Sequence, residues 1–284
     1  VRSCAASPGH VIRTGFVFHR DLSDLSDPGD LLDMEKETVE ELNMLITDRH
    51  GEAIDSLEAW KIKGKPASES HWVVGRSAYE LASAWIEGDA QEVATQLLEI
   101  RPELAGLRLD AGVAEKKTYF DSIRGGPRNH DLLLSGSCDE GPVVIGVEGK
   151  ADEPFDQTLE KRRATALKNT PNSRAGERID GLTKHFFGTT VEDDSGEPAL
   201  RTLGYQLLSA LAGTLADAKE HSANQCVLLI HEFVTDQTDD AKHELNERSL
   251  SDFLVRLYGD SLEKKGNDNA WITGPKTVVG DGEW

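Results

Sequence analysis

Short apolar runs in the middle of the chain predict β-strands. Residues 132–135 and 143–147 form two such runs, and the turn-rich hexamer SCDEGP separates them, which is typical of a β-hairpin. Residues 225–234, QCVLLIHEFV, have the clearest strand pattern of the chain, and residues 117–120 favour a further strand. The centre of the chain is therefore expected to be rich in β-structure.

Apolar residues recur at helical spacing on both sides of this centre. Capping boxes at Ser77–Glu80 and Asp89–Glu92 mark two helix starts. Further helices are predicted over residues 34–47, 158–168, 175–187, 200–219 and 249–259. This order of helices and strands predicts an α/β (α+β) fold, with a mixed central sheet flanked by helices.

The pattern divides the chain into three segments. Residues 1–74 are expected to be an N-terminal arm with a helical extension and a short strand at residues 15–19. Residues 75–259 carry the regular apolar patterns and form the predicted α/β domain, and residues 260–284 are expected to be a C-terminal tail.

Composition is that of a globular protein with an ample core, since 38% of the 284 residues are hydrophobic and 29% are charged. No apolar run approaches the roughly 20 residues that span a bilayer, and residues 11–18 are broken by Arg13 and Gly15, unlike a signal peptide. Three scattered cysteines without metal-type spacing favour reduced thiols. We therefore expect a cytoplasmic protein that does not enter a membrane.

The formal net charge of −20 opposes binding to nucleic acid at long range. However, the charge is unevenly distributed. The window 115–174 contains ten Lys/Arg and ten Asp/Glu, so the rest of the chain carries the whole acid excess. A solvated acidic surface explains that excess, and the neutral window contains the predicted hairpin.

Three charged residues meet at the open end of this hairpin. If the turn is centred between Asp139 and Glu140, Asp131 lies opposite Glu148 on the same face, and Lys150 follows on that face. A slip of one residue would break this pairing. Directly opposed carboxylates need a positive charge between them, and Mg²⁺ is suitable because it takes one or two carboxylates and keeps several waters. A charged strand end before a loop is the plainer alternative.

These residues resemble the PD-(D/E)XK nuclease-like superfamily, whose motif is an acidic residue followed by E-x-K on a hairpin. The strings GRSAYELASAW, VEGKADEPF, GYQLLSALAGTLADAK and CVLLIHEF resemble a domain-of-unknown-function branch of that superfamily, over roughly residues 75–257. The resemblance implies a restriction-endonuclease-like core, with Asp131 and Glu148 as ligands of Mg²⁺ or Mn²⁺ and Lys150 as the motif lysine. The leading proline of the motif is absent, because His130 precedes Asp131.

The resemblance also implies supporting residues. Glu115 is the nearest match to an upstream helix glutamate, with a position at the start of a strand as the alternative, and Gln206 matches a glutamine often found near such sites. Close helix packing is the alternative for Gln206. Several basic residues could hold phosphates or could simply face solvent: Arg124, Arg128, Lys161, Arg162 and Arg163. Asp152 could extend the metal site, or it could cap the next helix.

Two functions follow as hypotheses. The first is a Mg²⁺-dependent nuclease or phosphodiesterase, hence a hydrolase, whose partner is nucleic acid. The second is a non-catalytic acidic binding or regulatory protein, similar to a DNA mimic, on a nuclease-like fold.

Overall fold

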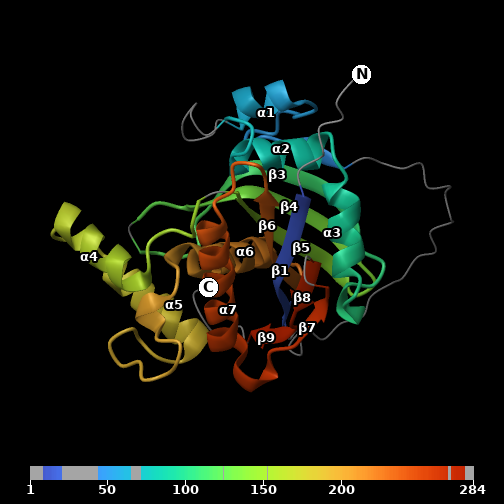
Figure 1. The fold of residues 1–284 in the computed structure, drawn as a ribbon. Coiled ribbons are helices and arrows are strands. Elements are labelled where there is room, and N and C mark those ends of the chain that lie inside the picture. The colour runs from blue at the N-terminus through green and yellow to red at the C-terminus, as the bar shows by residue number, and fades with distance from the viewer. Residues whose placement is uncertain are drawn as a thin grey trace.

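A curved mixed β-sheet forms the centre of the molecule (Figure 1). The computed structural model describes residues 9–20, 44–64, 72–123, 125–151, 153–267 and 270–278. Within these ranges the strands run in the order β2-β3-β4-β5-β6-β1-β8-β7, and β9 also pairs with β1. Their bounds are β1 Gly9–Arg20, β2 Leu45–Thr47, β3 Arg108–Thr118, β4 Arg128–Cys138, β5 Gly141–Lys150, β6 Gln225–Val234, β7 Lys264–Gly266, β8 Ala270–Thr273 and β9 Lys276–Val278.

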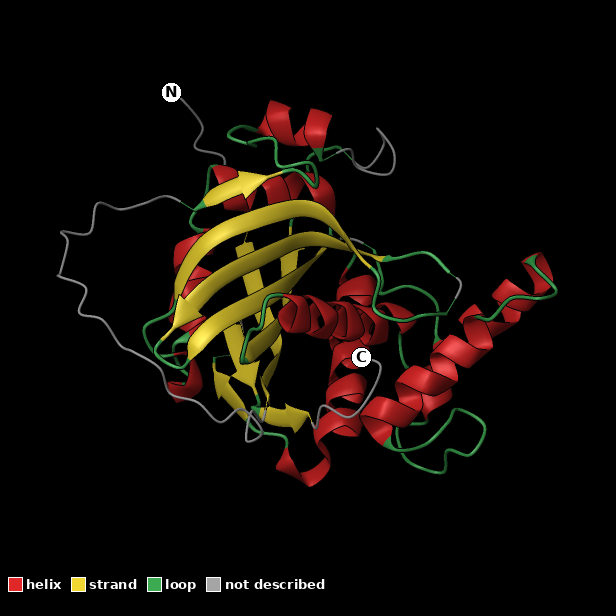
Figure 2. Cartoon of the chain, turned by 180° about the vertical axis from the view of Figure 1, so that it is seen from behind, coloured by secondary structure: helices red, strands yellow, loops and turns green. Residues whose placement is uncertain are grey.

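Helices cover both faces of the sheet, which confirms the predicted α/β class. Their bounds are α1 Leu57–Lys63, α2 Ser77–Ile86, α3 Ala90–Leu98, α4 Leu159–Asn169, α5 Ala175–Phe187, α6 Tyr205–Glu220 and α7 Asp240–Tyr258. One apolar core lies between the sheet and α1–α3, and a second lies between the sheet and α5–α7. Figure 2 shows from behind how the strands curve beside the central helices, while α4 projects from the body.

The β4–β5 hairpin has the register that the sequence predicts. The strands pair antiparallel from Cys138 with Gly141 to Leu132 with Val147, so Leu133 lies opposite Gly146. β5 also pairs with β6 in parallel, and nearly all residues of both strands are buried. Strands that are covered by helices on both faces read as continuous apolar runs, which explains the sequences VVIGV and QCVLLI.

The structure corrects two expectations about helices, one for the helix predicted over residues 34–47 and one for the N-cap of α4. Residues 45–47, at the end of the predicted helix 34–47, form strand β2, and residues 34–43 lie outside the described part. Thr158, whose hydroxyl accepts a hydrogen bond from the Lys161 amide, is the N-cap of α4. The cap expected from Asp152 is therefore wrong, and Asp152 itself is among the residues left undescribed.

The expected arm and tail both contribute strands to the sheet. β1 pairs antiparallel with β6 and so lies inside the sheet, and β7, β8 and β9 follow α7. The sheet thus joins segments from both ends of the chain to the predicted domain. In the part of the chain that the structure describes, every helix is too short or too polar to cross a membrane.

The close packing of α6 on β5 leads to a first prediction. A Cβ atom at Gly146 would collide with Thr214 on α6 and lie 3.2 Å from His130 Nδ1, whereas one at Gly149 would meet Leu81 at ordinary distances of 3.5 Å and more. We expect Gly146→Ala to lower the free energy of unfolding by roughly 1–3 kcal/mol, because overpacking forces the helix away from the strand.

Gly149→Ala, on the same strand, is the matched control and should be neutral or slightly stabilising. Urea unfolding of both variants measures the difference. Equal stabilities would show that α6 does not approach β5 as closely as described.

Candidate functional site

Two oppositely charged residues are buried at the end of β5. The exposed fraction is 1% for Glu148 and 4% for Lys150. Residues two apart in a strand share a face, so both side chains point toward α6, while Gly149 between them faces Leu81 on the other side of the sheet. Burying charges requires direct partners, because each ion loses its hydration.

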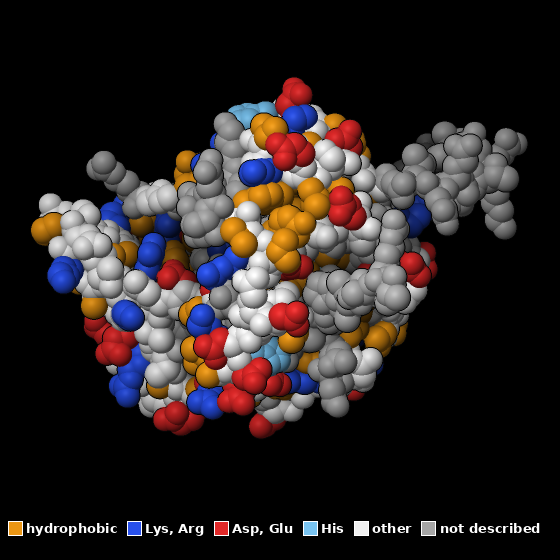
Figure 3. Space-filling model, turned by 45° about the horizontal axis from the view of Figure 1, so that its top comes forward, with side chains coloured by type: hydrophobic (Ala, Val, Ile, Leu, Met, Phe, Trp, Pro, Cys, Tyr) orange, Lys and Arg blue, Asp and Glu red, His pale blue; other side chains and the backbone are white. Residues whose placement is uncertain are grey.

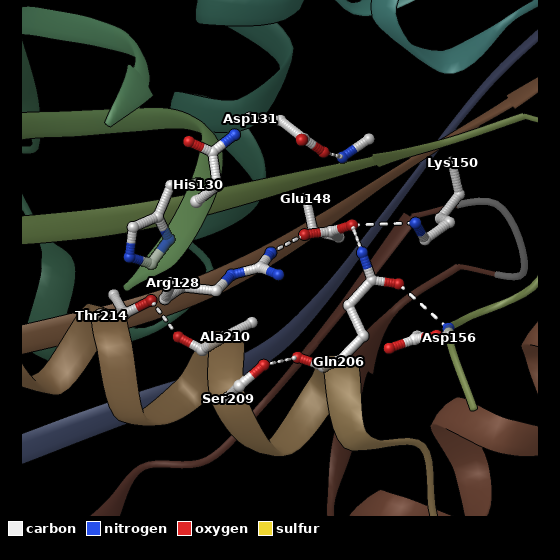
Figure 4. Close-up of polar contacts among 12 residues, drawn as sticks. Arg128, His130, Asp131, Glu148, Lys150, Asp156, Gln206, Ser209, Ala210 and Thr214 are labelled. Atoms are coloured by element: carbon white, nitrogen blue, oxygen red, sulfur yellow. Dashed lines mark hydrogen bonds and ion pairs between the residues drawn. The ribbon is translucent and has the colours of Figure 1, made fainter. Parts of the chain in front are cut away.

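Three donors converge on the Glu148 carboxylate (Figure 4). The Lys150 ammonium donates to Oε1 at 2.8 Å, and the Gln206 side-chain amide donates to the same oxygen. The Arg128 guanidinium forms an ion pair with Oε2. The predicted site residue Gln206, from the first turn of α6, therefore contacts Glu148 directly, and its own Oε1 accepts a hydrogen bond from the Asp156 amide at 3.3 Å.

Asp131 lies beside this cluster on β4. Continuing the β4–β5 register by one step would place Asp131 opposite Glu148, but the regular pairs end at Leu132 and Val147. Instead, Asp131 Oδ2 accepts a hydrogen bond from the Gly149 amide at 2.8 Å. The structure thus brings Asp131, Glu148 and Lys150 together at adjacent strand ends, as the hairpin pattern predicts.

Glu115 joins the cluster from the next strand. It lies within β3 rather than in an upstream helix, so the helical placement implied by the resemblance is wrong. The β3–β4 register pairs Ala114 with Leu132 and Lys116 with His130, which leaves Glu115 beside Asp131. Its backbone is left-handed, with a φ of 51°, and its carboxylate accepts a hydrogen bond from the Asn129 side chain.

The carboxyl groups differ in their charge balance. Burial alone would raise the pKa of Glu148, but Arg128 and Lys150 outweigh this effect and lower the pKa. Burial and then repulsion by Glu148 raise the pKa of Asp131. Burial also raises the pKa of Glu115 to about 7, against the hydrogen bond from Asn129. The negative charge of Glu148 is therefore balanced by two cations, whereas the positive charge near Asp131 and Glu115 does not outweigh burial and repulsion.

Lys150 is held in its charged form. Its burial alone would lower its pKa, but Glu148 and Asp131 outweigh burial and raise it. An ammonium with a raised pKa is a hydrogen-bond donor and a positive charge at neutral pH, and does not act as a proton acceptor.

The predicted phosphate-binding residues separate into different environments. Arg128 and Arg162 line a pocket of about 250 Å³ beside the carboxylates. Arg163 is held by Asp180 and Glu192, and Lys161 is exposed in the first turn of α4. Arg124 lies outside the described residues.

Residues that the sequence did not single out complete the pocket. Arg178 and Tyr205 line it, and Asn129 lines it while also donating to Glu115. Tyr205 directly precedes Gln206 in the string GYQLL, so adjacency to a candidate residue was the available signal. No sequence signal indicated Arg178, because α5 comes close to the other pocket residues only in the folded structure.

The donor chemistry fits a hard divalent cation only in part. Among the residues described, no group of three or more His, Cys, Asp or Glu side chains is arranged to hold a metal ion. Mg²⁺ needs only one or two carboxylates, however. Asp131 provides hard oxygen atoms where burial and repulsion outweigh the nearby positive charge, and Glu148 lies beside it, already paired with Arg128 and Lys150. The residues therefore fit a site that retains several waters, and not an all-protein cage.

Comparison with known families places most of the chain in one of them. Residues 53–273 match the family described as a domain of unknown function, DUF6946, and the chain belongs to this family. The searches of curated proteins and of solved structures gave no match.

The raised pKa of Glu115 predicts a pH-dependent stability. Between pH 4.5 and about 7 the native carboxyl retains a proton that the unfolded chain has released, so stability falls as the pH rises through this window. Glu115→Gln removes this titration. Relative to the unmodified chain, the variant should gain up to roughly 3 kcal/mol of unfolding free energy between about pH 5 and about pH 8.

Urea unfolding in the presence of a chelator measures this gain, with Glu87→Gln at an exposed position as the control for a glutamate-to-glutamine change. If the stability difference between Glu115→Gln and the unmodified chain did not change with pH, Glu115 would be titrating as an ordinary carboxyl.

Proposed function

We propose that this chain is a Mg²⁺-dependent nuclease or phosphodiesterase. The observation that carries the proposal is the buried Lys150–Glu148 pair beside Asp131, at the edge of a pocket with arginine side chains. Buried carboxylates with shifted pKa values beside a basic pocket are typical of a hydrolytic site for phosphate esters.

Lys150 stabilises negative charge in this proposal. Its ammonium lies 2.8 Å from Glu148 Oε1 and can donate further hydrogen bonds to an attacking water or to a phosphate oxygen. A positive charge that is fixed before the reaction is most effective in a buried site, where water does not screen it.

Asp131 and Glu148 would hold Mg²⁺ or Mn²⁺. When bound, such an ion activates water and neutralises the developing charge on a phosphoryl group. The oxygen atoms of Glu148 already accept hydrogen bonds from Lys150, Gln206 and Arg128. Binding of a cation to Glu148 therefore requires Arg128 or Gln206 to give up its contact, and an Arg128 displaced in this way would be free to contact substrate.

The resemblance to the PD-(D/E)XK nuclease-like superfamily supports the same assignment. Its motif places an acidic residue and E-x-K on one hairpin, and here Asp131 lies in the first half of β4 and Glu148-x-Lys150 at the end of β5. Sequence resemblance and site geometry together support the proposal, because the matched family is a domain of unknown function and adds no activity.

The proposal predicts cleavage that depends on Lys150. We expect the purified protein to cut plasmid, single-stranded DNA or RNA with Mg²⁺ or Mn²⁺ and not with chelator. Lys150→Met should lower the rate at least about 100-fold, because it removes a buried positive charge that stabilises the transition state. The change keeps side-chain volume, and circular dichroism and urea unfolding check the fold.

Lys168→Met, at an exposed position on α4, is the matched control and should cut at the unmodified rate. Asp131→Asn provides an independent test of the metal ligand. Activity that survives both Lys150→Met and Asp131→Asn would exclude this site as the catalytic one.

A second candidate is a non-catalytic binding protein that retains the site without its activity. The full occupation of Glu148 by three donors favours it, because this carboxylate is satisfied without metal. The net charge of −20 also suits a protein that binds basic partners.

Thermal unfolding distinguishes the two candidates. The nuclease proposal predicts that Mg²⁺ or Mn²⁺ at about 100 times its dissociation constant stabilises the fold by roughly 3 kcal/mol, and that Glu148→Gln abolishes this gain. The binding-protein candidate predicts no gain in either protein. Glu87→Gln, which should keep the full gain, controls for general effects of charge.

A further inference from the structure

The pocket beside the carboxylates has features that the proposed catalytic residues do not explain. Arg128 and Gln206 both line the pocket and both contact Glu148, so the pocket and the carboxylate cluster are continuous. A cavity of about 150 Å³ accommodates a benzene ring. The pocket of about 250 Å³ therefore has room for one planar ring with an attached group.

Among its described lining residues, the pocket has three arginines and one carboxylate, that of Asp156. The Arg128 side chain is 10% exposed, and its Nε is buried with no hydrogen-bond partner in the described part of the chain. Arg162 lines the same pocket and forms no ion pair among the described residues. Arg178, the third pocket arginine, pairs with Asp121 at 2.6 Å, and Arg128 pairs with Glu148, so Arg162 is the pocket arginine without an ion pair among the described residues.

The first turn of α6 adds to the positive potential. Tyr205, Gln206 and Ser209 all line the pocket, and this 16-residue helix has no acidic residue in its first turn and no side-chain N-cap. The amino end of a helix carries a partial positive charge and favours anions. Together with the unsatisfied Arg128 Nε, it indicates an anionic group such as phosphate.

Aromatic rings give the pocket flat surfaces as well as charge. The Arg162 guanidinium lies 5.2 Å from the Tyr205 ring centre, and the Arg178 guanidinium lies 5.0 Å from that of Phe120. Unpaired bases stack on aromatic rings and on guanidinium planes. A ligand with one flat ring and one phosphate fits this combination of chemistry and size.

The position of Arg162 is built into the fold. Thr158, the N-cap of α4, forms a β-bridge with Gly204, the residue before α6, and the Leu159 amide donates to the Leu203 carbonyl at 2.9 Å. These contacts hold the first turns of α4 and α6 side by side, which brings Arg162 over Tyr205. Lys and Arg side chains gather over the projecting α4 at the left of Figure 3.

We infer that this pocket binds one unpaired nucleotide of a single-stranded nucleic acid. Arg128, Arg162 and the α6 terminus contact its phosphate, and its base stacks against the Arg162–Tyr205 pair. The inference rests on the proposed function for its choice of nucleic acid, and it specifies the substrate class: single strands or frayed ends, in preference to duplex.

Binding without cleavage tests the inference. The unmodified protein in chelator is titrated into a fluorescently labelled single-stranded oligonucleotide and into the matching duplex, and anisotropy is recorded at fixed salt. We expect at least about tenfold tighter binding to the single strand, and an approximately tenfold loss with Arg162→Ala, since loss of one stacking and phosphate contact has this effect.

Lys168→Ala, which removes one exposed charge from the same helix, should weaken binding less than about twofold. Competition with a nucleoside monophosphate and with inorganic phosphate separates nucleotide recognition from simple anion binding. Displacement by the nucleotide at lower concentration supports the inference, and equal displacement by phosphate overturns it.

Equal affinity for duplex, or equal losses with Arg162→Ala and Lys168→Ala, would also overturn the inference. These outcomes do not depend on catalysis. A protein that binds single strands through Arg162 but never cuts would refute the nuclease proposal alone, whereas one that cuts duplex independently of Arg162 would refute the pocket assignment alone.

Discussion

The burial of two charges at the end of a fully covered strand constrains everything around the site. Glu148 and Lys150 continue β5 beyond its apolar run, between α2 on one face and α6 on the other. The desolvation of each ion costs several kcal/mol, which the ion pair alone does not recover. Arg128 and Gln206 therefore donate hydrogen bonds to Glu148, and the Gly149 amide donates one to Asp131. Apolar residues of similar volume would stabilise the same fold at least as well, which favours a functional reason for the charges.

Close packing also fixes the position of helix α6 against the sheet. Gly146 on β5 and Gly213 on α6 leave no room for a Cβ atom, so helix and sheet approach closely. Behind the site, Asp217 accepts a hydrogen bond from Thr118 at 2.5 Å and lies 3.3 Å from His130 Nε2, which ties α6 to β3 and β4. The first turn of the helix is thereby held beside Glu148. Catalytic candidates and pocket residues thus share one rigid support.

The features that could be predicted from the sequence are those that depend on local residue patterns. Strand periodicity and the SCDEGP turn were sufficient for the β4–β5 register, and hence for the proximity of Asp131, Glu148 and Lys150. Gln206 came from the resemblance, not from spacing. The pairing of β1 with β6 joins segments about 200 residues apart, and no local pattern records it. No local pattern indicated Arg178 either, and Tyr205 was marked only by its adjacency to Gln206. Both residues meet at the pocket because α4, α5 and α6 pack together. For Glu115 the sequence left a helix and the start of a strand open, and the structure places it inside strand β3 with a left-handed backbone.

The overall negative charge and a nucleic-acid ligand are compatible once distance is considered. Exposed charges farther apart than about 8 Å are largely screened at physiological ionic strength, so acidic residues elsewhere on the surface have little effect inside the pocket. The window 115–174 is neutral, and it supplies Arg128 and Arg162. Long-range attraction is then absent, and affinity has to come from short-range contacts with a nucleotide that enters the pocket. A duplex keeps its bases stacked and presents mainly its backbone charge, to which the acidic surface is unfavourable. The charge distribution and the pocket therefore both favour a ligand whose bases are already unpaired.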